Sequence, residues 1–224
     1  MPNTLRIIIE QCGEYNSKLY LLFIDFEKAF DSINRDCIWL SLRRRGIPEK
    51  LISLIKESYE QARCYVLHKG KLSDPFLVQS GVRQGCILSP LLYLVVMEDV
   101  LSAIESSNRG IQWQINNKYI NYLAYADDIC MLSHRLCGLK QQAADLQERM
   151  QYTGLKMNTS KTKTLNVGAN TATPLILGDQ TYNCVPNFCY LCCEIDAGGG
   201  CDLDVNARIN KARSSFYISP NLAE

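Results

Sequence analysis

The sequence predicts an α+β fold made of short hairpins and amphipathic helices, and three observations predict it. A nearly continuous apolar run, Leu19–Ile24, ends in Asp25, which is typical of a buried strand. Two further apolar runs flank the pair Asp127-Asp128, so this acidic pair is expected at a hairpin tip. Apolar residues also recur at helical spacing in several segments, which predicts helices that cover the strands.

Two helices are predicted after the first strand. Asp31 and Ser32 are expected to begin a helix that stops at Gly46, because short polar residues cap helix starts and glycine ends helices. Pro48 favours the first turn of the next helix. The apolar face of the first helix is predicted to contain Ile33, Ile38, Leu40 and Leu42.

A hairpin and a third helix are predicted next. Residues 63–68 and 75–79 are rich in strand-forming residues and flank the turn Lys69-Gly70. Ser89-Pro90 is a favourable helix start, and the apolar stripe that follows continues to about Ser106.

The acidic hairpin has predicted strands on both sides. Asn116-Asn117 indicates a turn, residues 119–124 a strand and residues 129–132 the returning strand. A helical stripe then runs through Leu139, Ala143, Leu146 and Met150, and Gly154 is expected to end that helix.

The C-terminal part is predicted to contain short strands to about residue 195, a glycine joint and one helix. The joint is Ala197-Gly198-Gly199-Gly200. The helix is expected to carry an apolar stripe of Val205, Ile209, Ala212 and Phe216. The predicted domain organisation is therefore residues 1–196 as the main domain and residues 197–224 as the hinge and the start of a further helical region.

Composition limits the classes of function. The 224 residues include 24 Lys+Arg and 23 Asp+Glu, so the net charge of +1 gives no bulk electrostatic signature of a polyanion-binding protein. Eleven cysteines without a signal peptide predict free thiols in a reducing compartment, either cytoplasm or nucleus. Cys189-x-x-Cys192 has zinc-ligand spacing, but nothing nearby completes a tetrahedral site. No apolar run is long enough to cross a membrane, so no membrane partner is predicted.

Three carboxylates carry the main chemical prediction. Asp25 follows one buried strand, and Asp127 and Asp128 lie between two others. Burying unpaired carboxylates is costly, so their proximity to a core indicates a bound cation or an exposed tip. Hard oxygen ligands suit Mg²⁺, and carboxylates around Mg²⁺ are the parts needed for nucleotidyl transfer.

Four motifs occur in order and resemble those of reverse transcriptases of the non-LTR retrotransposon (LINE-like) type. They are Phe23-Ile-Asp-Phe-Glu-Lys-Ala-Phe-Asp31, Ser80-Gly-Val-Arg-Gln-Gly-Cys-Ile-Leu-Ser-Pro90, Tyr125-Ala-Asp-Asp128 and Gly154-Leu-Lys-Met-Asn-Thr-Ser-Lys161. The resemblance implies a polymerase palm, an antiparallel sheet backed by helices, with partial fingers and about one thumb helix. In this interpretation residues 1–196 hold the palm and partial fingers, and residues 197–224 begin the thumb.

The resemblance also implies a function and its ligands. The function is RNA-directed DNA polymerisation, with an RNA template, a DNA primer and dNTPs as partners. Asp25 and Asp127 would bind two Mg²⁺ ions, for which Mn²⁺ can substitute, and Asp128 would lie beside them. Lys161 occupies the position of a family lysine near the triphosphate, where it could donate a proton to pyrophosphate or offset its charge.

Five further residues are implied in nucleotide and primer contacts. Phe30 corresponds to the bulky residue under the incoming sugar, where a ring leaves no room for a 2′-hydroxyl; Phe26 belongs to the same motif and is placed in the same site. Gln84 and Gly85 correspond to contacts with the nascent base pair and template, and Tyr125 to packing near the primer end.

Two departures from the family pattern affect what is expected. Tyr190-Leu191 resembles the start of a primer-contacting hairpin, but Cys192 replaces the glycine that commonly follows. The chain begins 24 residues before Asp25, so a truncated chain with little of the fingers region is expected.

Two other functions stay open at this point. An RNA-templated RNA polymerase would share the same carboxylates, and the ring of Phe30 argues against it. A catalytically inactive retroelement remnant or domesticated nucleic-acid-binding scaffold would fit the short fingers region, and the intact carboxylates argue against it. The sequence does not determine the oligomeric state.

Overall fold

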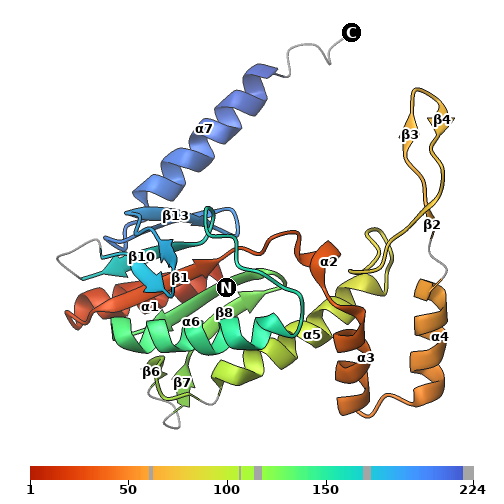
Figure 1. Ribbon diagram of the computed structural model, residues 1–224. Coiled ribbons are helices and arrows are strands. Elements are labelled where there is room, and N and C mark those ends of the chain that lie inside the picture. Colours follow the sequence, from red (N-terminus) through yellow and green to blue (C-terminus); the bar gives the residue numbers. More distant parts are fainter. Residues whose placement is uncertain (61–62, 106, 114–117, 169–172, 219–224) are drawn as a thin grey trace. The chain divides into compact units, whose positions relative to one another are not determined.

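The computed structural model describes residues 1–60, 63–105, 107–113, 118–168 and 173–218 (Figure 1). The helices are α1 (Pro2–Glu14), α2 (Ala29–Ser32), α3 (Arg35–Arg44), α4 (Glu49–Glu60), α5 (Ser89–Glu105), α6 (Leu136–Gln151) and α7 (Asp202–Ile218). The strands are β1 (Leu19–Ile24), β2 (Arg63–Cys64), β3 (Leu67–His68), β4 (Lys71–Leu72), β5 (Phe76–Leu77), β6 (Ile111–Trp113), β7 (Lys118–Ile120), β8 (Tyr122–Tyr125), β9 (Asp128–Ser133), β10 (Lys163–Val167), β11 (Leu175–Leu177), β12 (Gln180–Tyr182), β13 (Asn187–Tyr190) and β14 (Cys193–Asp196).

The chain divides into two compact units. Unit 1 contains Met1–Asp25, Glu105–Ala144 and Asn158–Glu224, and unit 2 contains Phe26–Ile104 and Asp145–Met157. All three predicted metal ligands therefore belong to unit 1.

The main sheet of unit 1 has four antiparallel strands in the order β10-β1-β9-β8. The central strand β1 pairs with β10 on one side and with β9 on the other. Successive residues of β1, such as Leu21 and Leu22, are both fully buried, so both faces of this strand are covered. This explains why its sequence is apolar throughout rather than alternating.

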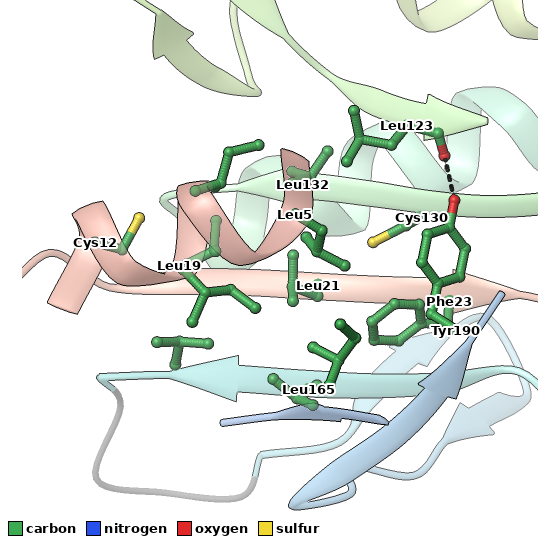
Figure 2. Packing of buried hydrophobic residues seen from close by; sticks show 14 of the residues in the cluster. Leu5, Cys12, Leu19, Leu21, Phe23, Leu123, Cys130, Leu132, Leu165 and Tyr190 are labelled. Carbon is green, nitrogen blue, oxygen red and sulfur yellow. Dashed lines mark hydrogen bonds between the residues drawn. The ribbon is translucent and has the colours of Figure 1, made fainter. Parts of the chain in front are cut away.

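Helix α1 covers one face of this sheet. Its residues Leu5, Ile8, Ile9 and Cys12 recur at helical spacing and are buried in one hydrophobic cluster with residues of β1, β9 and β10 (Figure 2). Burying a leucine completely is worth about 1.5–3 kcal/mol, so this face accounts for a large part of the helix's attachment.

The predicted strand over residues 119–124 is present, but it is interrupted at Asn121 and forms two strands instead of one. Strand β7 before it pairs with β6, whereas β8 after it pairs with β9 in the main sheet. The Asn121 side chain is 3% exposed; its Nδ2 donates to the Glu105 carbonyl, and its Oδ1 accepts from Gln142 Nε2 at 2.7 Å. These tertiary hydrogen bonds stabilise the break between β7 and β8, and no local sequence pattern predicts them.

Unit 2 begins with a different helix start from the predicted one. Asp31 and Ser32 end the short helix α2, and α3 begins at Arg35. Asn34 is the N-cap, since its side chain accepts a hydrogen bond from the Asp36 amide at 2.9 Å. The apolar face is also shifted: Trp39 is buried, whereas Leu40 is largely exposed.

Other predicted elements agree with the structure. The turn Lys69-Gly70 has positive φ at both residues and joins β3 to β4, while β2 pairs with β5 at the base of the same hairpin. Helix α5 begins at Ser89, and α6 carries the predicted buried residues Leu139, Ala143, Leu146 and Met150. The predicted turn Asn116-Asn117 lies outside the described residues.

Helix α7 carries the predicted apolar residues Val205, Ile209 and Phe216 on its exposed surface. The acidic Asp204 of the same helix is buried, which the sequence did not predict. Polar contacts of Asp204 with Arg6 and with the Glu194 amide attach α7 to α1 and β14. Within the described part of the chain, no helix is both long enough and apolar enough to cross a membrane.

Candidate functional site

The order of the strands brings Asp25 and Asp128 to the same edge of the main sheet. Asp25 follows the last residue of β1, Asp128 is the first residue of β9, and these two strands are antiparallel neighbours. The register ends with Ile24 opposite Ile129, so Asp25 and Asp128 come directly after the last pair of this ladder. Two carboxylates that are 103 positions apart in the numbering of the chain thus meet because of the strand pairing.

The acidic pair lies at a hairpin tip as predicted, but Asp128 is already the first residue of β9, so the two turn residues are Ala126 and Asp127. Tyr125 pairs with Asp128, and Ala126 adopts a left-handed conformation with φ of 54°. Asp127 and Asp128 are exposed, and the Tyr125 ring is 63% exposed. The turn therefore presents both carboxylates and an aromatic ring to solvent.

The loop before β10 fixes the backbone of Asp25. The Asn158 amide donates to the Asp25 carbonyl at 2.8 Å, and the Asp25 amide donates to Thr162 Oγ1 at 3.2 Å. Asn158 Oδ1 in turn accepts from the amides of Ser160 and Lys161. Asn158 of the fourth motif and the adjacent Thr162 therefore fix the backbone that carries the Asp25 carboxylate.

The same loop directs Lys161 toward Asp25. Phe23 pairs with Lys163 across β1 and β10, so Lys161 lies opposite Asp25 when the register is extended. The Nζ atom of Lys161 lies 3.6 Å from Asp25 Oδ1. Because the lysine side chain is 67% exposed, this ion pair adds little to stability, about 0–1 kcal/mol, and the lysine is free to exchange partners.

The charges of Asp25 and Asp127 act on the neighbouring carboxylate of Asp128. Partial burial raises the pKa of Asp128 above its usual value, and the charges of Asp127 and Asp25 raise it further. Asp25 Oδ1 is buried and has no hydrogen-bond partner. Hence negative charge is concentrated at this sheet edge and only partly neutralised.

Carboxylate oxygens with this arrangement fit a hard divalent cation. The Oδ1 atom of Asp25, which accepts no hydrogen bond, is an available ligand atom, and a cation would relieve the repulsion that acts on Asp128. Among the described residues, no three His, Cys, Asp or Glu side chains are gathered so that they could hold a metal ion together. The structure thus pairs Asp25 with Asp128, and the full ligand set remains a prediction.

An open cavity of about 450 Å³ adjoins the carboxylates in unit 1. Its lining includes Asp25, Asp128, Lys161, Lys163, Phe188 and Tyr190. Acidic and basic groups therefore share one solvent-accessible space, as a site for a phosphate-bearing ligand with its cation requires.

Unit 2 holds the residues predicted to contact the nucleotide. Phe30, Gln84 and Gly85 line a cavity of about 530 Å³. The ring of Phe30 stacks on the buried ring of Tyr93, with centroids 4.7 Å apart and an interplanar angle of 8°. Phe26, in contrast, is buried, and its backbone pairs with Met157.

The second motif is tied to the first through backbone bonds. The Gly81 amide donates to the Ile33 carbonyl, and the Val82 amide to the Phe30 carbonyl, both at 2.7 Å. A Cβ atom at Gly81 would lie 2.5 Å from the carbonyl oxygen of Phe30, so only glycine fits there. This close approach fixes the loop that carries Gln84 and Gly85 against the segment that carries Phe30.

Sequence reasoning missed the positioning roles of Asn158 and Thr162. Both lie in a run of short polar residues before β10, and such residues often bond to nearby backbone groups. That composition was a usable signal, but the partner, Asp25, is 133 positions before Asn158 and could not be identified from it.

Comparisons with known proteins agree with this arrangement. The family model described as reverse transcriptase (RNA-dependent DNA polymerase) matches residues 2–195. The chain is 27% identical over 161 residues to the Pol polyprotein of the type-2 retrotransposable element R2DM of Drosophila melanogaster, covering 72% of this chain and 15% of that protein. It is 31% identical over 174 residues to the Pol polyprotein of the type-1 retrotransposable element R2 of Nasonia vitripennis, covering 72% and 16%.

Solved telomerase structures share the fold. Apo telomerase from Candida tropicalis, lacking its C-terminal domain, superposes with a TM-score of 0.57 at 19% identity, covering 82% of this chain and 39% of that one. Telomerase of the same organism in complex with a fragment of telomeric RNA gives 0.54 at 18% identity, covering 81% and 32%. The α+β palm fold predicted from the sequence is thereby confirmed.

The resemblance stated from four motifs is confirmed over most of the chain, although the chain spans only 15% and 16% of the two retrotransposon proteins. The chain belongs to the reverse transcriptase (RNA-dependent DNA polymerase) family, and its relatives are proteins of non-LTR retrotransposons.

Proposed function

We propose that this chain is a polymerase palm that adds deoxynucleotides to the 3′-hydroxyl of a primer paired with an RNA template. Reverse transcriptases generally use divalent metal ions and bind RNA templates. The observation that supports the proposal best is the register that places Asp25 beside Asp128 at one sheet edge.

Asp25 and Asp127 are the proposed ligands of two Mg²⁺ ions, with Asp128 beside them. Such ions, when bound, lower the pKa of the primer hydroxyl and stabilise the charge on the departing pyrophosphate. The chain's own residues orient this site: Asn158 and Thr162 bond the backbone of Asp25, and the turn at Ala126 presents Asp127.

Lys161 is the proposed partner of the triphosphate. In the structure its ammonium group lies 3.6 Å from Asp25, on the wall of the cavity that the carboxylates share. As the bond from the α-phosphorus to the bridging oxygen breaks, negative charge grows on pyrophosphate, and a nearby ammonium group stabilises it or donates a proton to it.

Phe30, Gln84 and Gly85 are the proposed nucleotide-selecting residues, and Tyr125 the proposed residue near the primer end. Tyr93 holds the ring of Phe30 in one orientation by stacking, which a steric barrier against a 2′-hydroxyl requires. Gln84 Nε2 donates to Asp31 at 3.1 Å, so its amide is oriented by the same segment. Phe26 is proposed to support this segment from beneath, since its side chain is buried.

The test is extension of a labelled DNA primer on an RNA template by the purified chain, with Mg²⁺ and all four dNTPs. Wild type is expected to extend the primer, and Asp127→Asn to reduce the rate at least a hundredfold, because a neutral amide is a weak ligand for Mg²⁺. Asp179→Asn is the matched control: Asp179 is exposed in the turn between β11 and β12, away from the cavity, and this variant should keep the wild-type rate.

Direct titration with Mn²⁺ separates the proposal from a non-catalytic scaffold. Binding that is lost in Asp127→Asn and kept in Asp179→Asn would support the polymerase. A chain that neither extends primers nor binds Mn²⁺ through these carboxylates would instead be a nucleic-acid-binding remnant, and the proposal would be wrong.

A further inference from the structure

Tyr190, the last residue of β13, bonds to both strands of the acidic hairpin. Its hydroxyl lies 3.3 Å from the carbonyl oxygen of Leu123 on β8 and 3.3 Å from that of Asp128 on β9. Figure 2 shows this side chain reaching toward the Leu123 carbonyl. One buried phenol therefore connects the two strands that present Asp127 and Asp128.

The ring of Tyr190 is fixed by packing. It is 2% exposed, and its centroid lies 5.4 Å from that of Phe23, which in turn stacks on Phe188 at 4.4 Å. Phe23 lies two residues before Asp25 on β1. The same aromatic group thus contacts the strand that ends in Asp25 and the hairpin that holds the other two carboxylates.

A tyrosine hydroxyl is a hydrogen-bond donor near neutral pH. A backbone carbonyl can only accept, so the carbonyls of Leu123 and Asp128, each 3.3 Å away, share the one phenolic proton in a three-centre hydrogen bond.

The β13–β14 hairpin is itself anchored. Its turn, Leu191-Cys192, has positive φ at both residues, and Tyr190 pairs with Cys193 directly across it. The amide of Glu194 donates to Asp204 at 3.0 Å on helix α7. Tyr190 thus projects from a short, tight hairpin that is bonded at its other strand to a helix.

We propose that Tyr190 is a positioning residue for the catalytic carboxylates: its hydroxyl braces the hairpin that carries Asp127 and Asp128. This inference rests on the proposed function of those carboxylates. The resemblance to known reverse transcriptases assigns this hairpin to primer contact, but a side chain that is 2% exposed lies inside the protein and contacts the acidic hairpin instead.

Tyr190→Phe tests the brace, because it keeps the ring and removes only the hydroxyl. Tyr182→Phe is the matched control: Tyr182 is also fully buried in unit 1, and its hydroxyl donates to Gln180 at 2.6 Å, in the separate β11–β12 sheet. Both variants remove one buried hydroxyl. Any effect on the acidic hairpin that is seen only in Tyr190→Phe is therefore due to the loss of the bonds to that hairpin.

The first readout is amide hydrogen exchange of residues 122–131 in the chain without divalent cations. Tyr190→Phe should accelerate exchange in this segment several-fold, while Tyr182→Phe should leave it unchanged. Equal exchange in wild type and Tyr190→Phe would overturn the proposal, whether or not the chain is active.

The second readout is Mn²⁺ binding followed by primer extension. Removing residues that orient metal ligands typically lowers metal affinity 10–100-fold. Tyr190→Phe should therefore weaken Mn²⁺ binding about tenfold. The Mn²⁺ concentration needed for half-maximal primer extension should rise by the same factor. Faster exchange with unchanged Mn²⁺ affinity would assign Tyr190 a merely structural role and overturn the proposal. If wild type binds no Mn²⁺ and extends no primer, the proposed function fails, and the exchange result alone decides whether the brace exists.

Discussion

The guanidinium of Arg6 donates a hydrogen bond to the carboxylate of Asp204 at 2.6 Å and thereby joins the first helix of the chain to the last. Asp204 is almost fully buried and also accepts from Arg208 at 3.0 Å and from the Glu194 amide. These contacts attach α7 through charge, since its large apolar residues Leu203, Val205, Ile209 and Phe216 are exposed.

Asp204→Asn should lower the midpoint of thermal unfolding by several degrees near neutral pH. The hydrogen bond from Arg6 lowers the pKa of Asp204 far below its usual value, with the Glu194 amide and Arg208 contributing. A depressed folded pKa gives stability that is present above the unfolded pKa, about 3.9, and is lost as the pH falls toward the folded pKa. The difference in unfolding midpoint between wild type and Asp204→Asn should therefore become smaller below about pH 4. Thermal melts across that pH range measure this difference. A constant difference from pH 3 to pH 7 would contradict this explanation.

Asp128→Asn should have the opposite effect on stability when no divalent cation is present. Burial and the charges of Asp127 and Asp25 raise the pKa of Asp128, so its ionised form is disfavoured in the folded chain, and this cost appears as the pH rises through the folded pKa. The gain should be small, about 0.5 kcal/mol or less, because the group is exposed and screened.

Adding Mg²⁺ should make wild type more stable than Asp128→Asn. Thermal melts of both proteins with and without Mg²⁺ measure this change. Wild type should be stabilised by binding the cation, and Asp128→Asn less so, because it has lost one carboxylate. A variant that is less stable than wild type without Mg²⁺ would show that the negative charge of Asp128 does not strain the folded chain.

Gly81→Ala should destabilise the chain by about 3 kcal/mol or more. The positive φ at this position disfavours any side chain, and the neighbouring backbone leaves no room for a Cβ atom. Its φ is +75°, and a Cβ atom would lie 2.5 Å from the Phe30 carbonyl oxygen. Gly70→Ala is the matched control: its φ is +77°, but nothing lies within 4 Å, so it should cost only about 1–2 kcal/mol. Urea unfolding of both variants measures the difference, and equal costs would show that the close approach to Phe30 is unimportant.

The sequence predicted those elements that local pattern determines. The uninterrupted apolar run of β1, the helix that begins at Ser89 and the acidic turn before Asp128 were all identified, because each has a strong local signal. That three carboxylates gather at strand ends was predicted from the residues, but the register that sets β1 against β9 depends on residues distant in the sequence and could not be read from it.

Features set by tertiary contacts were missed. The break at Asn121 depends on Gln142 and Glu105, and the burial of Asp204 in α7 depends on Arg6. A polar residue in a helix normally indicates a solvated face, so nothing in the local sequence of α7 predicts that Asp204 is buried. Burying Asp204 is possible here only because its oxygens are bonded to two arginines and a backbone amide.

Phe30→Ala should change which sugar the chain accepts. The ring is held by stacking on Tyr93 and lines the cavity that also contains Gln84 and Gly85. Removing it opens space for a 2′-hydroxyl, so the efficiency of ribonucleotide addition relative to deoxynucleotide addition should rise about tenfold or more. Single-nucleotide extension with dNTP and NTP in turn measures the ratio.

Phe76→Ala supplies the control for that experiment, because Phe76 is an exposed phenylalanine of unit 2 on β5 and lies outside the cavity. It should leave the ratio unchanged. If Phe30→Ala lowers both activities by the same factor, the ring supports the fold without selecting the sugar. If wild type itself prefers NTPs, a phenylalanine at this position does not exclude the 2′-hydroxyl, and the chain makes RNA rather than DNA.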